Sequence, residues 1–248
     1  MNKSLGNTQT SSRPGSLKAS PSAWMAGALL LIPIVLTFCL TMLVSKSNNW
    51  ALFYLGYMLV CLITLAVLVL ILKQRGLTFK DIGFNEFKAS YLGWGLLFFG
   101  IAGVWCTGVA LILKYGFGLT KDWLLNIRFS QPYHPLIMLL AVVVIGPVTE
   151  ESVFRGFFLT VMRQKWSLWL AGLVSAVLFG LYYYFLTGLT GALLIFFWSP
   201  LPIILFLRHK SIYPGIVLHM VNNLFPYVII KLLSEVAVVQ KLTEIGVL

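Results

Sequence analysis

The sequence predicts an all-α, polytopic membrane protein with about seven transmembrane helices. Three observations support this fold class: 59% of the 248 residues are hydrophobic, only 10% are charged, and the mean hydropathy is +0.92. One soluble core could not bury that much apolar surface. Lipid is therefore expected to cover much of it, because a helix of about 20 apolar residues is long enough to cross the hydrocarbon core.

The first 23 residues differ from the rest, since they are rich in Ser, Thr, Asn, Gly and Pro. Such a segment cannot bury enough apolar surface to fold, so a disordered basic tail is expected over residues 1–23. The tail is too polar for a signal peptide, and the apolar run that follows is too long for the apolar region of one. We expect a single helical transmembrane domain over residues 24–248, with its first span retained.

Apolar stretches of helical length predict the individual spans in order along the chain. They are expected at residues 24–45, 50–72, 91–115, 136–162, 168–186, 189–207 and 212–232. Residues 233–248 alternate apolar and polar side chains with helical spacing, so an interfacial or partial eighth helix is expected there. Residues 73–90 mix charged with apolar side chains and are expected to lie at the level of the lipid headgroups.

The basic residues predict an orientation and exclude one class of partner. Most of the 18 Lys and Arg residues lie in loops that a cytoplasmic N-terminus would place inside, so the positive-inside rule favours that topology. The net charge of +11 is scattered over the tail and the loops. Anionic lipid headgroups are therefore the expected partner, and nucleic acid is not. Cys39, Cys61 and Cys106 lie in apolar runs without a CxxC pair, which favours neither a disulfide nor a zinc site.

Two of the seven acidic residues, Glu150 and Glu151, are adjacent within an apolar stretch. An acid in mid-membrane costs a few kcal/mol at least, so it marks a candidate functional site. Arg155 lies four residues after Glu151 on the same helical face, which predicts a charge-assisted pair. At about 100° per residue Glu150 points away from Arg155 and is expected to face a cavity. A salt bridge that only joins helices would explain Glu151 and Arg155 and leave Glu150 unpaired.

A second polar site lies in the last predicted span, where His219 and Asn223 are four residues apart and share a face. A single histidine in a membrane is as often a packing hydrogen-bonder as a catalyst. The asparagine one turn away and the free Glu150 favour a site here. Counting about 1.5 Å per residue from the predicted membrane ends, Glu150, His219 and Asn223 could meet near the midplane.

These residues resemble the motifs of a known family. The segment from Glu150 to Arg155 matches the EExxxR motif of the CPBP family, which comprises CAAX proteases and bacteriocin-processing enzymes and is also called Abi. His219 and Asn223 match its HxxxN motif, and the resemblance covers about residues 136–226. The family also has an FxxxH motif between these two. It corresponds here to a segment that ends in Tyr183, so a tyrosine replaces the histidine.

The resemblance implies roles for these side chains. In the family, the first glutamate and the middle histidine activate the attacking water, while the later histidine and asparagine stabilise the oxyanion. Glu150 would then be the general base, with Tyr183 at the position of its helper, and His219 and Asn223 would be the oxyanion donors. A tyrosine hydroxyl can orient water but does not exchange a proton at neutral pH as histidine does. A slower enzyme and a pseudoenzyme therefore both stay open.

The leading functional prediction is a glutamate-dependent intramembrane endopeptidase of the CPBP type, in a bacterial cell membrane, that cleaves peptides or membrane proteins without a cofactor. The alternative is a catalytically inactive relative that binds a partner membrane protein or peptide in immunity or cell-envelope regulation. A transporter is less favoured, because the intramembrane charges cluster instead of lining a path. Asp81 and Asp122 lie in loops, and HExxH is absent, which argues against aspartyl and zincin chemistry. A metal on Glu150, Glu151 and His219 would be short of ligands.

Overall fold

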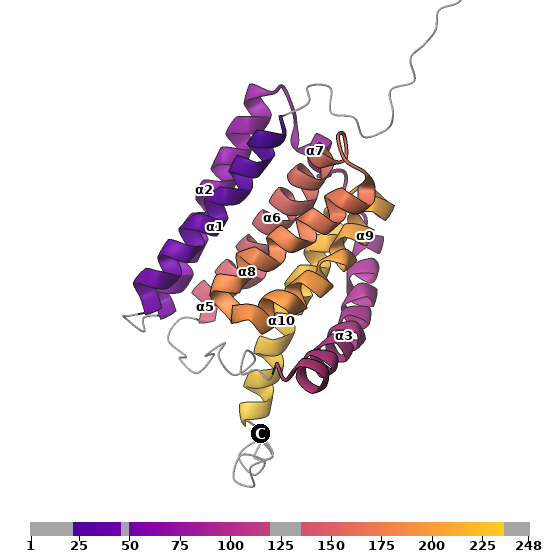
Figure 1. The fold of residues 1–248 in the computed structure, drawn as a ribbon. Coiled ribbons are helices and arrows are strands. Elements are labelled where there is room, and N and C mark those ends of the chain that lie inside the picture. The colour runs from indigo at the N-terminus through magenta and orange to yellow at the C-terminus, as the bar shows by residue number, and fades with distance from the viewer. Residues whose placement is uncertain (1–21, 46–49, 120–134, 236–248) are drawn as a thin grey trace, which may run out of the picture.

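The computed structural model describes residues 22–45, 50–119 and 135–235, and every regular element in these ranges is helical. Figure 1 shows them as a bundle in which most of the long helices run alongside one another. This confirms the predicted all-α fold class. The physical reason is that backbone groups in lipid find hydrogen-bond partners only within a helix or a closed barrel.

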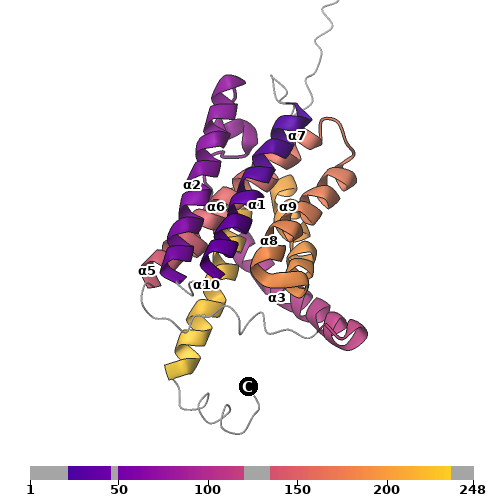
Figure 2. The ribbon, with the colours of Figure 1, turned by 60° about the vertical axis from the view of Figure 1, so that its left-hand side comes forward.

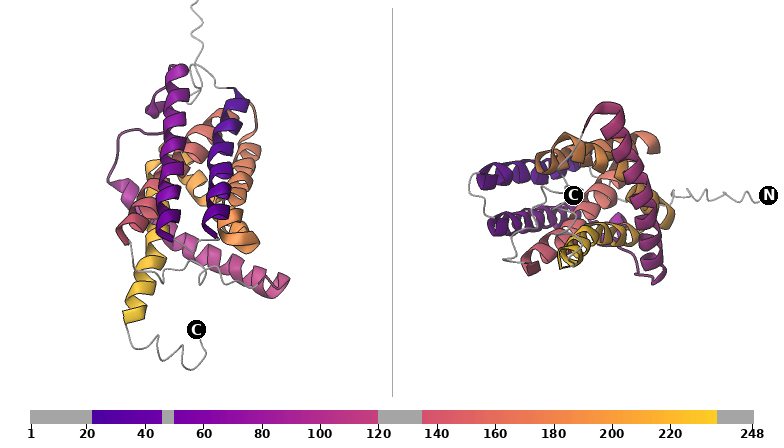
Figure 3. Two further views of the ribbon diagram at one scale, coloured as in Figure 1. Left: turned by 90° about the vertical axis from the view of Figure 1, so that its left-hand side faces the viewer. Right: turned by 90° about the horizontal axis from the view of Figure 1, so that it is seen from below.

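The first three long helices follow the sequence prediction to within about two residues at each end. They are α1 (Ala23–Ser45), α2 (Trp50–Gln74) and α3 (Ser90–Phe117). Large apolar side chains such as Leu59 and Val104 are exposed on them, as expected for surfaces that lipid covers. Figures 2 and 3 show α1 and α2 side by side along one flank of the bundle, with α3 on the opposite flank.

The fourth predicted span is one continuous helical rod, but its winding changes along its length. It comprises α5 (Pro135–Met138), π-helical η2 (Leu139–Ile145), α6 (Gly146–Glu150), π-helical η3 (Glu151–Leu159) and α7 (Thr160–Met162). The sequence did not predict the two π-helical stretches, which are uncommon and occur frequently at functional sites. Every residue of η3 is buried, so this rod forms the centre of the bundle.

The next predicted pair of spans is built differently from the prediction. Helix α8 (Leu168–Trp198) covers the first span and about half of the second, and it bends at Gly188, whose φ of 69° and ψ of −173° are not helical. The bend lies between the predicted spans 168–186 and 189–207. Its two halves pack closely, because a Cβ at Gly180 would lie 3.0 Å from the carbonyl oxygen of Ala192.

The chain then continues into two further helices, α9 (Pro200–His209) and α10 (Tyr213–Glu235). Pro200 stands in the first turn of α9, where its missing N–H costs nothing. Five stretches of the described chain are long and apolar enough to cross a membrane: Trp24–Val44, Ala51–Gln74, Ser90–Phe117, Leu136–Met162 and Leu168–His209. The predicted count of seven is therefore not confirmed, since α8 and α9 form one of these stretches and α10 is not among them. The predicted tail and most of the predicted C-terminal helix lie outside the described residues.

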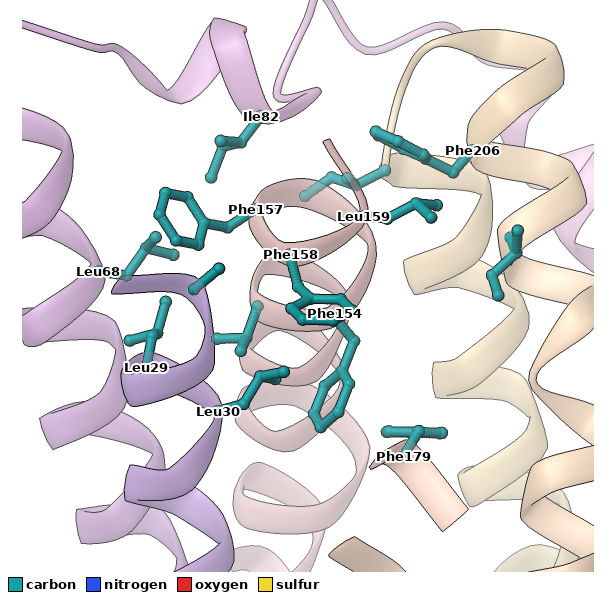
Figure 4. Packing of buried hydrophobic residues seen from close by; sticks show 14 of the residues in the cluster. Leu29, Leu30, Leu68, Ile82, Phe154, Phe157, Phe158, Leu159, Phe179 and Phe206 are labelled. Atoms are coloured by element: carbon teal, nitrogen blue, oxygen red, sulfur yellow. The ribbon is translucent and has the colours of Figure 1, made fainter. Parts of the chain in front are cut away.

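A core of large apolar side chains surrounds η3 and fixes its place between the other helices. Figure 4 shows the η3 phenylalanines against side chains from α1, α2, α8, α9 and the short 3₁₀ turn η1 (Phe79–Ile82). Gly156 allows η1 to pack closely against η3, because a Cβ at this position would lie only 2.7 Å from the carbonyl oxygen of Ile82. The polar residues of the same rod are consequently held deep in the bundle.

Candidate active site

Polar side chains from four parts of the bundle meet at one buried position beside this core. We call this cluster the glutamate site, and it consists of Tyr57, Glu150, Glu151, Arg155, Tyr183 and His219. They come from α2, from the junction of α6 with η3, from α8 and from α10. The hydrophobic surroundings make each hydrogen bond in the cluster electrostatically stronger than it would be in water.

The expected contact between Glu151 and Arg155 is present. Arg155 Nη1 lies 3.2 Å from Glu151 Oε1, and both side chains are buried. Arg155 Nη2 donates a hydrogen bond of 2.9 Å to the hydroxyl of Ser199, at the end of α8. The guanidinium also lies over the ring of Phe179, with 4.1 Å between its central carbon and the ring centroid. The charge of Arg155 is thus stabilised by a carboxylate, a hydroxyl and an aromatic face.

Glu150 is not the unpaired, cavity-facing acid that the helical wheel predicted. Its Oε1 accepts a hydrogen bond of 2.5 Å from the hydroxyl of Tyr57, and its Oε2 accepts one of 3.0 Å from the hydroxyl of Tyr183. The side chain is only 3% exposed. The wheel failed here because it considers one helix alone, and both donors come from other helices, α2 and α8.

His219 lies between the two glutamates and contacts both. Its Nδ1 is 3.0 Å from Glu151 Oε1, and its Nε2 is 3.5 Å from Glu150 Oε2. Because an ionised carboxylate only accepts hydrogen bonds, Nδ1 carries the hydrogen in the contact with Glu151. Trp198 flanks the imidazole, with 4.9 Å between the ring centroids. The second ring nitrogen is therefore directed at Glu150 and held there by the first.

Asn223 is on the same helix as His219 but makes a different contact. Its Nδ2 donates a hydrogen bond of 2.9 Å to the carbonyl oxygen of Val142, within π-helical η2. This bond joins α10 to the rod that carries Glu150. Asn223 is thus placed one turn from His219, and its amide has a second hydrogen that this bond does not use.

Tyr183 occupies the position expected for the helper of the base. Its hydroxyl binds Glu150 directly, and its ring packs against Phe179 and Tyr182 with centroid separations of 5.1 and 5.3 Å. The side chain of Tyr183 is partly exposed, whereas that of Tyr57 is buried. Of the two tyrosines that bind Glu150, Tyr183 is thus the one with an exposed surface.

Three residues around the site were missed by the sequence reasoning. Tyr57 and Ser199 bind Glu150 and Arg155, and Trp198 packs on His219 with a buried indole N–H that has no acceptor among the described residues. A tyrosine in the middle of an apolar stretch was the one signal for Tyr57, and such a residue alone does not indicate which helix its hydroxyl reaches. Within the part of the chain that the structure describes, no group of three or more His, Cys, Asp or Glu side chains is arranged to hold a metal ion.

The glutamate site can perform proton transfer at a membrane-buried position. Glu150 can accept a proton from a molecule bound at Oε2, where His219 and Tyr183 also converge. A general base needs to be within hydrogen-bond reach of the proton that it removes, and this geometry provides such a place. An acid buried in a bundle of apolar helices marks a functional site in membrane proteins.

A comparison with protein families indicates the class of protein that carries this site. Residues 132–225 match the model of the Rce1-like family, described as type II CAAX prenyl endopeptidase Rce1-like. The matched segment contains Glu150, Tyr183, His219 and Asn223. Over this segment the match supports the assignment to the CAAX protease family that the motifs indicated. Together with the apolar helices, the match identifies an integral membrane protein.

A curated protein is similar to this chain over only part of its length. An uncharacterized 24.3 kDa protein of Escherichia coli is 33% identical over 81 residues, which cover 31% of this chain and 35% of that protein. The chain thus matches about a third of the length of this relative. No solved structure matches the chain.

Proposed function

We propose that the protein is a glutamate-dependent intramembrane endopeptidase of the CAAX type, which hydrolyses peptide bonds at or in the membrane with Glu150 as general base. The observation that carries this proposal is the geometry at Glu150 Oε2. This oxygen lies 3.5 Å from Nε2 of His219 and accepts a hydrogen bond from Tyr183, a partly exposed side chain. The separation is longer than a direct hydrogen bond, so a water molecule that displaces the Tyr183 hydroxyl would contact both groups.

The proposed reaction follows from that placement. Glu150 removes a proton from the water as its oxygen bonds to the carbonyl carbon of the peptide, which gives a tetrahedral oxyanion. With hydrogen on both ring nitrogens, His219 donates to Glu151 through Nδ1 and to the oxyanion through Nε2. The free amide hydrogen of Asn223 is the second donor. The proton on Glu150 then passes to the leaving nitrogen as the C–N bond breaks, which regenerates the carboxylate.

A second candidate function is a catalytically inactive relative that binds a peptide or a partner membrane protein. One observation favours it: both oxygens of Glu150 accept hydrogen bonds from tyrosine hydroxyls, one of which stands where the family has histidine. Protein donors then occupy the place of the water. The two functions differ in whether Tyr183 is displaced when a ligand binds.

Cleavage assays with matched variants test the proposal. Purified protein in proteoliposomes would be given a prenylated CAAX peptide and an unprenylated hydrophobic peptide. We expect Glu150→Gln to lower cleavage about 10²-fold or more, since a positioned base is typically worth 10²–10⁴-fold. Glu86→Gln changes an exposed acid outside the site and should leave the rate unchanged. No cleavage by the wild type, together with peptide binding that survives Glu150→Gln, would contradict the protease and support the scaffold.

A further inference from the structure

Tyr57 binds the proposed base from outside the segment that carries the family motifs. It lies on α2, 93 residues before Glu150, and its hydroxyl donates a hydrogen bond of 2.5 Å to Glu150 Oε1. The side chain is 6% exposed. The match to the family model begins only at residue 132. Neither the motifs nor the match therefore assigns a role to this tyrosine.

Gly146 leaves space for the hydroxyl of Tyr57 because it has no side chain. A Cβ at that position would lie 2.7 Å from the hydroxyl oxygen of Tyr57 and 3.0 Å from the carbonyl oxygen of Ala141. Gly146 is four residues before Glu150 and thus on the same face of α6. The absence of a side chain there allows the hydroxyl to pass the helix and reach the carboxylate. The Tyr57 ring is also stacked on Phe53, with 6.4 Å between centroids and 10° between planes.

The two tyrosines on Glu150 are not equivalent. Tyr57 binds Oε1 from a buried position, at the shorter distance of 2.5 Å. Tyr183 binds Oε2 at 3.0 Å from a partly exposed position, and Oε2 is also the oxygen that faces His219. A ligand can reach Oε2 by displacing Tyr183, while Tyr57 stays in place. One oxygen of the carboxylate is therefore anchored and the other is available.

We propose that Tyr57 is a positioning residue, which holds Glu150 Oε1 so that Oε2 stays directed at His219 and at the bound water. This proposal rests on the proposed function of Glu150 as the base. A charge-assisted hydrogen bond is about twice as strong as a neutral one, and a catalytic group must be held within about 0.5 Å of its productive place. Tyr57 thus keeps Glu150 in place when the bound water displaces the hydroxyl of Tyr183.

The test compares Tyr57→Phe with Tyr54→Phe, which removes a hydroxyl from the preceding turn of α2, away from the contact with Glu150. In the proteoliposome assay with the prenylated CAAX peptide, we expect Tyr57→Phe to lower kcat about 10–100-fold with little change in KM, because the loss of a positioning group acts on the transition state. The pH profile of kcat should also move, since the titrating carboxylate has lost a hydrogen bond. Tyr54→Phe should change neither. Equal kinetics and equal pH profiles for the two variants would overturn the proposal.

Gly146→Ala provides a second, independent variant. Its methyl group occupies the space of the Tyr57 hydroxyl, so it should reproduce the effect of Tyr57→Phe. Since both changes remove one hydrogen bond, the double variant should be no slower than the worse single variant. Fully multiplicative effects would contradict a shared hydrogen bond. Should Gly146→Ala fail to fold, Tyr57→Phe carries the test alone.

An infrared measurement separates the failure of this inference from the failure of the proposed function. The carboxyl band that disappears in Glu150→Gln is assigned to Glu150, and its frequency depends on the hydrogen bonds to that group. We expect Tyr57→Phe to shift this band and Tyr54→Phe to leave it in place. A shifted band in a protein that cleaves neither peptide would refute the protease and retain Tyr57 as the residue that positions Glu150. An unshifted band would overturn the inference itself.

Discussion

Arg155 shows how much a single buried charge depends on its partners. Its side chain has 0% exposure, and Glu151, Ser199 and the face of Phe179 surround the guanidinium. Removing the charge of Arg155 would leave the carboxylate of Glu151 buried without a compensating charge. The contribution of the pair to stability is therefore best seen by breaking it.

We expect Arg155→Ala to destabilise the protein by about 3–5 kcal/mol, because it leaves Glu151 as an uncompensated buried charge. Thermal unfolding and folded yield in detergent would measure the loss. Arg163→Ala removes an exposed arginine that follows α7 and is the matched control, with little expected change. An unfolding temperature equal to that of the wild type would show that the ion pair contributes no net stability.

A single substitution at Tyr183 distinguishes the two candidate functions. Tyr183→His places an imidazole beside Glu150 and should rebuild the pair that activates water in the family. If the protein is a weakened protease, cleavage of the prenylated CAAX peptide should rise about 10²–10⁴-fold, the usual worth of a positioned acid–base group. Tyr184→His makes the same change at an exposed neighbour and should have no effect. No gain from Tyr183→His, with weaker peptide binding, would support the inactive scaffold.

At the scale of the elements, the bend in α8 determines how the site is enclosed. Tyr183 precedes the bend and binds Glu150, and Ser199 follows the second half of the helix and binds Arg155, so residues on both sides of the bend contact the glutamate site. Gly188 adopts a φ of 69° with a ψ of −173°, a conformation that is essentially restricted to glycine. The bend is thus encoded by the absence of a side chain at one position.

We expect Gly188→Ala to destabilise the protein by about 1–3 kcal/mol, the usual cost of forcing a side chain into such a conformation. Gly172→Ala is the control, because Gly172 lies in the regular first part of α8 and a Cβ added there would meet no other atom within 4 Å. That change should be neutral or slightly stabilising, since alanine favours helix. Thermal unfolding in detergent compares the two. Equal stabilities would mean that the bend tolerates a side chain.

For the whole molecule, the distribution of charge predicts how the bundle sits in the membrane. Figure 1 shows the start of α1 and the ends of α2 and α7 at one end of the bundle, with α5 and the end of α10 towards the other. Basic residues that follow α2 and α7, such as Arg75 and Lys165, therefore lie at the same end. The positive-inside rule predicts that this end faces the cytoplasm.

Single cysteines in a cysteine-free background test this topology. A cysteine in place of Lys165 should react with a membrane-impermeant thiol reagent only after the cells are permeabilised. A cysteine in place of Lys114, in the last turn of α3, should react in intact cells. Both lysines are exposed, so neither change should disturb the fold. The reverse pattern of labelling would place the N-terminus outside.

The sequence by itself determined the fold class, the bounds of α1, α2 and α3, and the identity of the charged site. These follow from local properties: the hydropathy of a stretch sets where lipid covers it, and an acid inside such a stretch is costly enough to stand out. The contact of Glu151 with Arg155 could also be foreseen, because four residues along one helix fix which side chains meet.

Only the tertiary structure decided what surrounds Glu150. Its partners Tyr57, Tyr183 and His219 come from three other helices, and hydrogen bonds between helices depend on rotations and separations that no single stretch encodes. The π-helical winding next to Glu150 likewise depends on packing in the buried rod. The bond of Asn223 to the carbonyl of Val142 is a consequence of the same packing. The sequence thus named every residue of the glutamate site except Tyr57, and the packing of the helices determined their partners.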